Sequence, residues 1–136
     1  MEKIFLTITW ITACVLVIQD FMYGQVRISW LIGFVVSCVG LSVLKQQCPC
    51  LIPFYIFSLV GCFYYVLYKR QGLGSADYFV VFGVSFLLHE RDWPLFMMLC
   101  GFFGVIGYVL RRDTSIKEFP FIPGILLSAF IVKLIY

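Results

Sequence analysis

Two aspartates stand where charged residues give way to long apolar runs, and they are the strongest candidates for chemistry in this sequence. Asp20 closes the first apolar run, and Asp77 opens a later one in the stretch "GLGSADYFVVFGVSF". An aspartate at a helix end is often a solvated cap, and Asp77 suits that role. Two carboxyl groups brought close together cannot both ionise easily, so they share a proton. The ionised member can then take a proton from water while the protonated member polarises a peptide carbonyl, which is aspartic-protease chemistry.

The composition indicates a chain that lies largely in a membrane. The 136 residues are 62% hydrophobic and 12% charged, whereas a soluble domain is about 45–50% apolar and about 25% charged. This length predicts one domain, residues 1–136. The N-terminus is interpreted as a retained first span, because Glu2 offsets Lys3 and no small-residue cleavage site follows. The net charge of +3 is scattered along the chain, so nucleic acid is not an expected partner.

Charged and turn residues divide the chain into six apolar segments, and we expect an all-α bundle of about six transmembrane helices. The segments are Ile4–Gln19, Ser29–Leu44, Leu51–Tyr68, Tyr78–Leu88, Trp93–Leu110 and Phe119–Ile135. Most are shorter than the roughly 20 residues that cross hydrocarbon. The fourth is the shortest, and we expect it to borrow residues from both flanks or to lie where the bilayer is thinned. The segments do not alternate in polarity, so strands of a membrane barrel are not expected.

The basic residues predict that both termini lie outside the cell membrane. With this orientation the inner loops hold Arg27, Lys69, Arg70, Arg111, Arg112 and Lys117, and the outer side holds Lys3, Lys45, Arg91 and Lys133. Positive residues are enriched on the cytosolic side of membrane proteins. Asp20 and Asp77 then share the cytosolic membrane face, which makes them candidate partners.

The other polar candidates have simpler explanations. The remaining acids lie in termini or polar loops, where solvation explains them: Glu2, Glu90, Asp92, Asp113 and Glu118. The cysteines of "CPC", Cys48 and Cys50, do not have zinc-ligand spacing, and His89 is far away in sequence. No metal site is therefore expected.

The motifs around the two aspartates resemble those of the type IV prepilin peptidases, which are membrane aspartic proteases with a G-x-G-D motif. In "GLGSADYF", Gly72 and Gly74 match a longer form of that motif, Ala76 stands where the family has glycine, and Asp77 matches the catalytic aspartate. Asp20 falls on the first catalytic position, although the proline that often follows it in the family is missing. Glycine lets a substrate backbone approach closely, but Gly72 and Gly74 equally suit a loop turn.

A third stretch, "EFPFIPGILLSAFIV", is similar to the proline-rich opening of the family's last span, with Pro120 and Pro123 carrying the match. Together the three motifs extend over essentially the whole chain. The chain has no room for the cysteine-containing methyltransferase insert of the long family members, so it resembles the short, peptidase-only forms.

The resemblance implies a specific activity and location. A multi-pass protein of the cell membrane would cut the basic leader from prepilins or pseudopilins at the cytosolic face, using Asp20 and Asp77 without metal or cofactor. Asp113 and Glu118 would help to attract the basic leader. Two other hypotheses remain open: a small transporter or channel that uses membrane-embedded acids, and an assembly subunit without catalytic acids.

Overall fold

The described part of the chain folds into helices. The computed structural model describes residues 1–23, 25–68, 75–110 and 121–135, and all regular structure within these residues is helical. The six helices are α1 (Glu2–Tyr23), α2 (Ile28–Leu44), α3 (Ile52–Tyr68), α4 (Ser75–Ser85), α5 (Trp93–Leu110) and α6 (Ile122–Ile135). The expected all-α class is confirmed.

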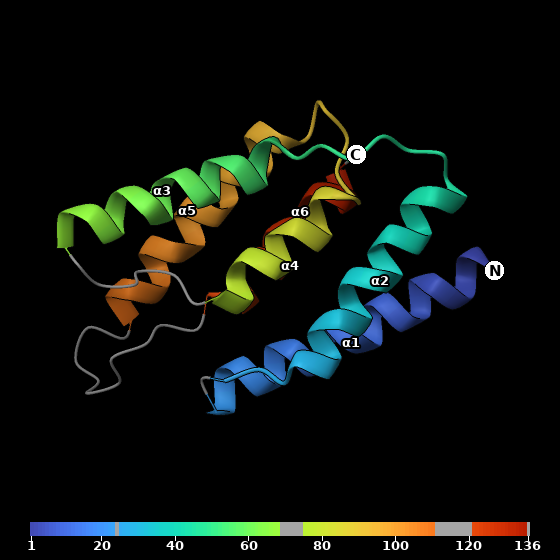
Figure 1. Ribbon diagram of the computed structural model, residues 1–136, viewed down its shortest axis with the longest axis horizontal. Coiled ribbons are helices and arrows are strands. Elements are labelled where there is room, and N and C mark those ends of the chain that lie inside the picture. Colours follow the sequence, from blue (N-terminus) through green and yellow to red (C-terminus); the bar gives the residue numbers. More distant parts are fainter. Residues whose placement is uncertain (24, 69–74, 111–120, 136) are drawn as a thin grey trace.

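Helices α4 and α6 lie side by side at the centre of the bundle. Helices α1 and α2 pack on one side of this pair, and α3 and α5 pack on the other (Figure 1). The central pair contributes several fully buried apolar side chains, which include Val80, Val81 and Val84 of α4 and Ile122 and Ile125 of α6. A short helix can hold this central position because it is apolar on every face that meets a neighbour.

Buried hydroxyl groups are satisfied within their own helices. Thr12 of α1, Ser85 of α4 and Ser128 of α6 are buried, and each hydroxyl donates to the backbone carbonyl four residues earlier at 2.7–2.8 Å. Local bonds of this kind remove the cost of burying a hydroxyl among apolar side chains. The interior of the bundle is therefore more polar than its apolar composition alone would indicate.

The fourth helix begins and ends earlier than the sequence predicts. It was expected over Tyr78–Leu88 with residues borrowed from both flanks, but it runs from Ser75 to Ser85 and borrows only from the N-terminal flank. The carbonyl of Ser85 accepts the backbone N–H of Cys50, from the α2–α3 connection, at 3.0 Å. This carbonyl is the one that the next helical turn would need, so a contact from a distant part of the chain ends α4.

Helix α1 is longer than expected and is the one helix, within the described residues, that is long and apolar enough to cross a membrane unaided. A signal sequence at an N-terminus has the same length and composition. The other five are shorter apolar helices. The arrangement as six membrane spans therefore stays a prediction. Because α1 continues to Tyr23, Asp20 lies inside the helix rather than closing it.

Candidate functional site

Asp20 is buried where α1 meets the start of α6. Its side chain is 9% exposed, and its Oδ2 accepts the backbone N–H of Ile122, the first residue of α6, at 3.2 Å. The first N–H groups of a helix lack partners within the helix, and its N-terminus favours negative charge. Asp20 thus caps a helix that begins about a hundred residues later in the sequence, and it is not the solvated helix end that the simplest interpretation predicted.

Asp77 lies in the first turn of α4 and is also buried, with 6% of its surface exposed. An acid in this turn is favoured by the dipole of its own helix. Ala76 beside it packs against the hydrophobic core, and Tyr78 crosses to α3, where its hydroxyl lies against Gly61. These contacts fix the start of α4 between its neighbours.

The pairing of α1 with α2 places Asp20 beside the start of α2. The two helices are antiparallel, since Glu2 of α1 forms an ion pair with Lys45 after α2 at 3.4 Å. At the other end of the pair, the backbone N–H of Arg27 donates to Oε1 of Gln19 at 3.2 Å. Asp20, which follows Gln19, therefore lies at the same height along the bundle as the first residues of α2.

The pairing of α2 with α4 brings Asp77 to the same end of the bundle. Gly83 of α4 lies against Phe34 of α2, and the two helices run in the same direction (Figure 1). Moving back along both helices by the same number of residues from this contact leads to Asp77 on α4 and Ile28 on α2. Both acids thus lie at the end where α1 finishes and where α2, α4 and α6 begin. A direct approach of the two carboxyl groups stays a prediction.

Two of the three sequence motifs meet at this end. Pro123 follows Ile122 in the first turn of α6, so the proline-rich stretch starts the helix that Asp20 caps. Four of the proposed site residues, Gly72, Gly74, Asp113 and Glu118, lie outside the described residues, as does Pro120.

Asp92 corrects an expectation, because it is not a solvated loop acid. It is 2% exposed, and its Oδ2 accepts the backbone N–H of His89 at 3.2 Å. It immediately precedes α5, whose second residue is Pro94. An aspartate shortly before a proline at the start of a long apolar run is a helix-start signal, and that signal would have identified Asp92 as the residue that precedes a helix. It lies beyond the end of α4, whereas Asp77 lies at the start of that helix.

Comparison with protein-family models, with curated proteins and with solved structures gives no match to this chain.

Proposed function

We propose that this chain is a membrane aspartic endopeptidase that removes the basic leader from prepilins or pilin-like proteins at the cytosolic face of the cell membrane. The observation that carries the proposal is the burial of two aspartates, Asp20 and Asp77, at one end of the helical bundle. Two buried carboxyl groups at one level of a bundle are the minimum that aspartic-protease chemistry needs. The motif resemblance around both positions supplies the substrate class.

The distribution of apolar side chains supports placement in a bilayer. Large apolar side chains point outward on the flanking helices, such as Leu59 of α3 at 74% exposed and Met98 of α5 at 72%. Exposed apolar surface on this scale is unusual for a soluble monomer. Several hydroxyl and carboxyl side chains lie inside instead, among them those of Thr12, Asp77 and Ser128, which is the polarity expected of helices surrounded by lipid.

The shortness of α4 supports access of water to the acids. Its 11 residues extend over roughly 16 Å, at about 1.5 Å per residue, which is about half of the roughly 30 Å hydrocarbon layer. Where the bilayer thins around a helix this short, the first turn of the helix lies at the membrane surface. Asp77, in that first turn, is then close to the polar interface from which the hydrolytic water comes.

The chemistry follows from two acids that share one proton. The ionised carboxylate takes a proton from the attacking water, and the protonated carboxyl donates to the oxygen of the scissile carbonyl. The apolar helix of the substrate packs along the bundle within the bilayer, and its basic leader stays in the cytosol. Asp113 and Glu118, which the basic-residue pattern of the sequence predicts to be on the cytosolic side, attract that leader.

The test is the processing of a co-expressed prepilin by variants at the two acids. Asp20→Asn and Asp77→Asn should each abolish the size shift of the pilin on a gel, because an amide neither accepts the proton from water nor replaces the shared proton. Asparagine keeps a carbonyl oxygen, so the bond from the N–H of Ile122 survives. Loss of processing then reports chemistry and not loss of the α6 cap.

Asp92→Asn is the matched control, since it changes another buried acid away from the pair. It should process the pilin normally when the amount of membrane-inserted protein is matched. Normal processing by both Asn variants at positions 20 and 77 would contradict the peptidase and leave an assembly role. Absence of processing by the unchanged protein, together with ion-dependent flux in vesicles, would favour a transporter.

A further inference from the structure

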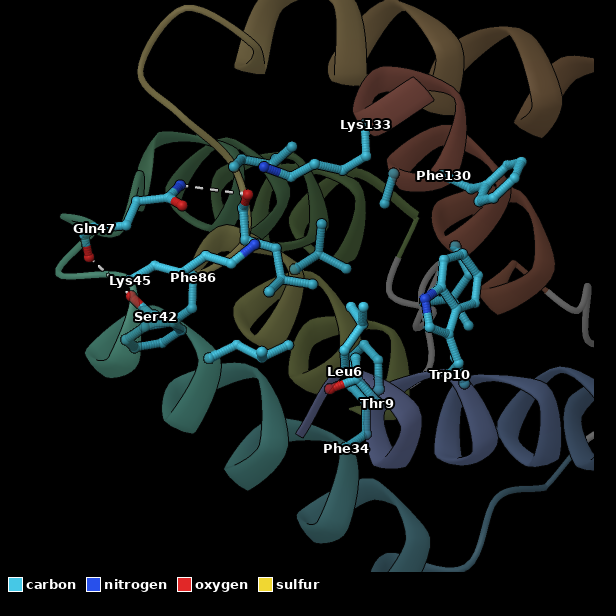
Figure 2. A pocket seen from close by; sticks show the side chains of 17 residues that line it. Leu6, Thr9, Trp10, Phe34, Ser42, Lys45, Gln47, Phe86, Phe130 and Lys133 are labelled. Atoms are coloured by element: carbon cyan, nitrogen blue, oxygen red, sulfur yellow. Dashed lines mark hydrogen bonds between the residues drawn. The ribbon is translucent and has the colours of Figure 1, made fainter. Parts of the chain in front are cut away.

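A cavity opens between α1, α2, α4 and α6 at the end of the bundle away from Asp20 and Asp77. It has a volume of about 200 Å³. Its walls are largely apolar and include Leu6 and Trp10 of α1, Phe34 of α2 and Phe130 of α6. The rings of Trp10 and Phe130 meet edge to face with centroids 5.2 Å apart, and they form one side of the cavity (Figure 2).

The two hydroxyl groups in the cavity wall have their hydrogen bonds satisfied elsewhere. The hydroxyl of Thr9 donates to the carbonyl of Phe5, and that of Ser42 donates to the carbonyl of Gln47, both at 2.8 Å. A site of this kind offers little to water, and even a smaller apolar cavity of about 150 Å³ stays dry and takes up benzene. The cavity therefore suits a hydrocarbon chain.

The mouth of the cavity is basic and continues into a polar hollow. Lys45 and Lys133 line both spaces, and Figure 2 shows their side chains reaching over the cavity from opposite sides. The adjoining hollow has a volume of about 560 Å³ and also includes Gln47, His89 and Glu90. An apolar chamber that leads directly into a basic, polar one is complementary to an amphiphile.

The positive charges of the two lysines favour the binding of an anion between them. Lys45 is paired with Glu2 at 3.4 Å. Lys133 lines the same cavity as Lys45, and two ammonium groups at the mouth of one cavity repel each other. An anion that bridges the two ammonium groups would relieve this repulsion and form charge-assisted hydrogen bonds with both. Glu90, on the rim of the polar hollow, lies where the outer part of a headgroup would be.

From these features we infer that the cavity binds one membrane phospholipid, with an acyl chain inside the apolar chamber and the phosphate between Lys45 and Lys133. Lysine ammonium groups form charge-assisted hydrogen bonds with phosphate oxygens. The lipid would connect α1, α2 and α6 at the end opposite to the acids, so it acts as a structural ligand. The inference does not depend on the catalytic pair.

The experiment measures lipid retention by the purified full chain in detergent, using native mass spectrometry. One molecule of dioleoyl phosphatidylglycerol or dioleoyl phosphatidylcholine should remain bound, and dioleoylglycerol, which lacks the phosphate, should not. The double variant Lys45→Gln with Lys133→Gln should lower the retained fraction about tenfold or more, because each charge-assisted bond lost weakens binding severalfold. Lys3→Gln is the matched control, since Lys3 is exposed at the same end of α1 and does not line the cavity.

Filling the chamber tests the acyl chain separately. Ala129→Leu and Leu6→Trp each add volume to the apolar wall without changing a charge, and each should reduce retention while the unfolding temperature stays near that of the unchanged chain. Retention of several lipids at once, unaffected by the lysine and wall variants, would show general lipid adhesion and overturn the inference. Equal retention of dioleoylglycerol would also overturn it. Asp20→Asn and Asp77→Asn should retain lipid normally. A failure of the peptidase proposal would therefore leave the expected lipid retention unchanged.

Discussion

Gln46 ends α2 in a backbone conformation that ordinarily belongs to glycine. Its φ is +50°, and the two bonds that follow the helix, from the N–H of Gln46 to Val43 and from the N–H of Gln47 to Ser42, form a Schellman motif. The left-handed region costs a residue with a Cβ atom roughly 1–2 kcal/mol. The motif turns the chain sharply directly after Lys45, which lines the cavity.

The strain at this position predicts that Gln46→Gly stabilises the protein. The gain should be about 1 kcal/mol, because glycine removes the Cβ conflict but adds freedom to the unfolded chain. Gln46→Ala is the control, since it removes the same exposed side chain and keeps the strain. Reversible unfolding in mixed micelles measures both. Equal stabilities for the two variants would mean that the backbone at this position is not strained.

At the scale of the helices, only some of the glycines are needed for two helices to pack closely together. A methyl group at Gly83 would lie 2.9 Å from Cε1 of Phe34, a ring that is 1% exposed and has no room to move. At Gly101 on α5 a methyl group would meet nothing within 4 Å. Glycine also weakens a helix interior by about 1 kcal/mol relative to alanine.

These contacts predict opposite effects for two identical substitutions. Gly83→Ala should destabilise the bundle by about 1–3 kcal/mol through overpacking between α2 and α4. Gly101→Ala should leave the stability unchanged or raise it by up to about 1 kcal/mol. Unfolding midpoints measured side by side in one detergent check the pair. A loss of stability at Gly101 alone would place an unseen partner on that face of α5.

The positions of the helices follow closely from the sequence, whereas their ends and contacts do not. Apolar runs bounded by charged residues were sufficient to predict all six helices, since each apolar run is too long for a solvent-exposed loop. The end of α4 depends on the bond from Cys50 to the carbonyl of Ser85, and the cap of α6 depends on Asp20. Both are bonds between segments far apart in sequence, which local patterns do not specify. The burial of Asp92 was not predicted, because an acid in a polar loop is normally solvated.

At the scale of the whole molecule, the two ends of the bundle differ in chemistry. The buried carboxyl groups of Asp20 and Asp77 lie at the end where α1 finishes and α6 begins, and Lys45, Lys133 and the N-terminus lie at the opposite end (Figure 1). If the bundle spans the membrane with its termini outside, the acids face the cytosol, where prepilin leaders are found. The proposed function therefore depends on orientation as much as on the acids.

Cysteine labelling in intact cells tests that orientation. Cys48 is exposed in the α2–α3 connection at the lysine end, and Tyr23 is exposed at the acid end. With the other cysteines replaced, a membrane-impermeant maleimide should label Cys48 from outside. In a chain without native cysteines, Tyr23→Cys should be labelled only after the membrane is permeabilised, because the distribution of basic residues predicts that this end is in the cytosol. The reverse pattern would put Asp20 and Asp77 on the outer face, where no prepilin leader is available, and labelling of both sites in intact cells would contradict the six-span arrangement itself.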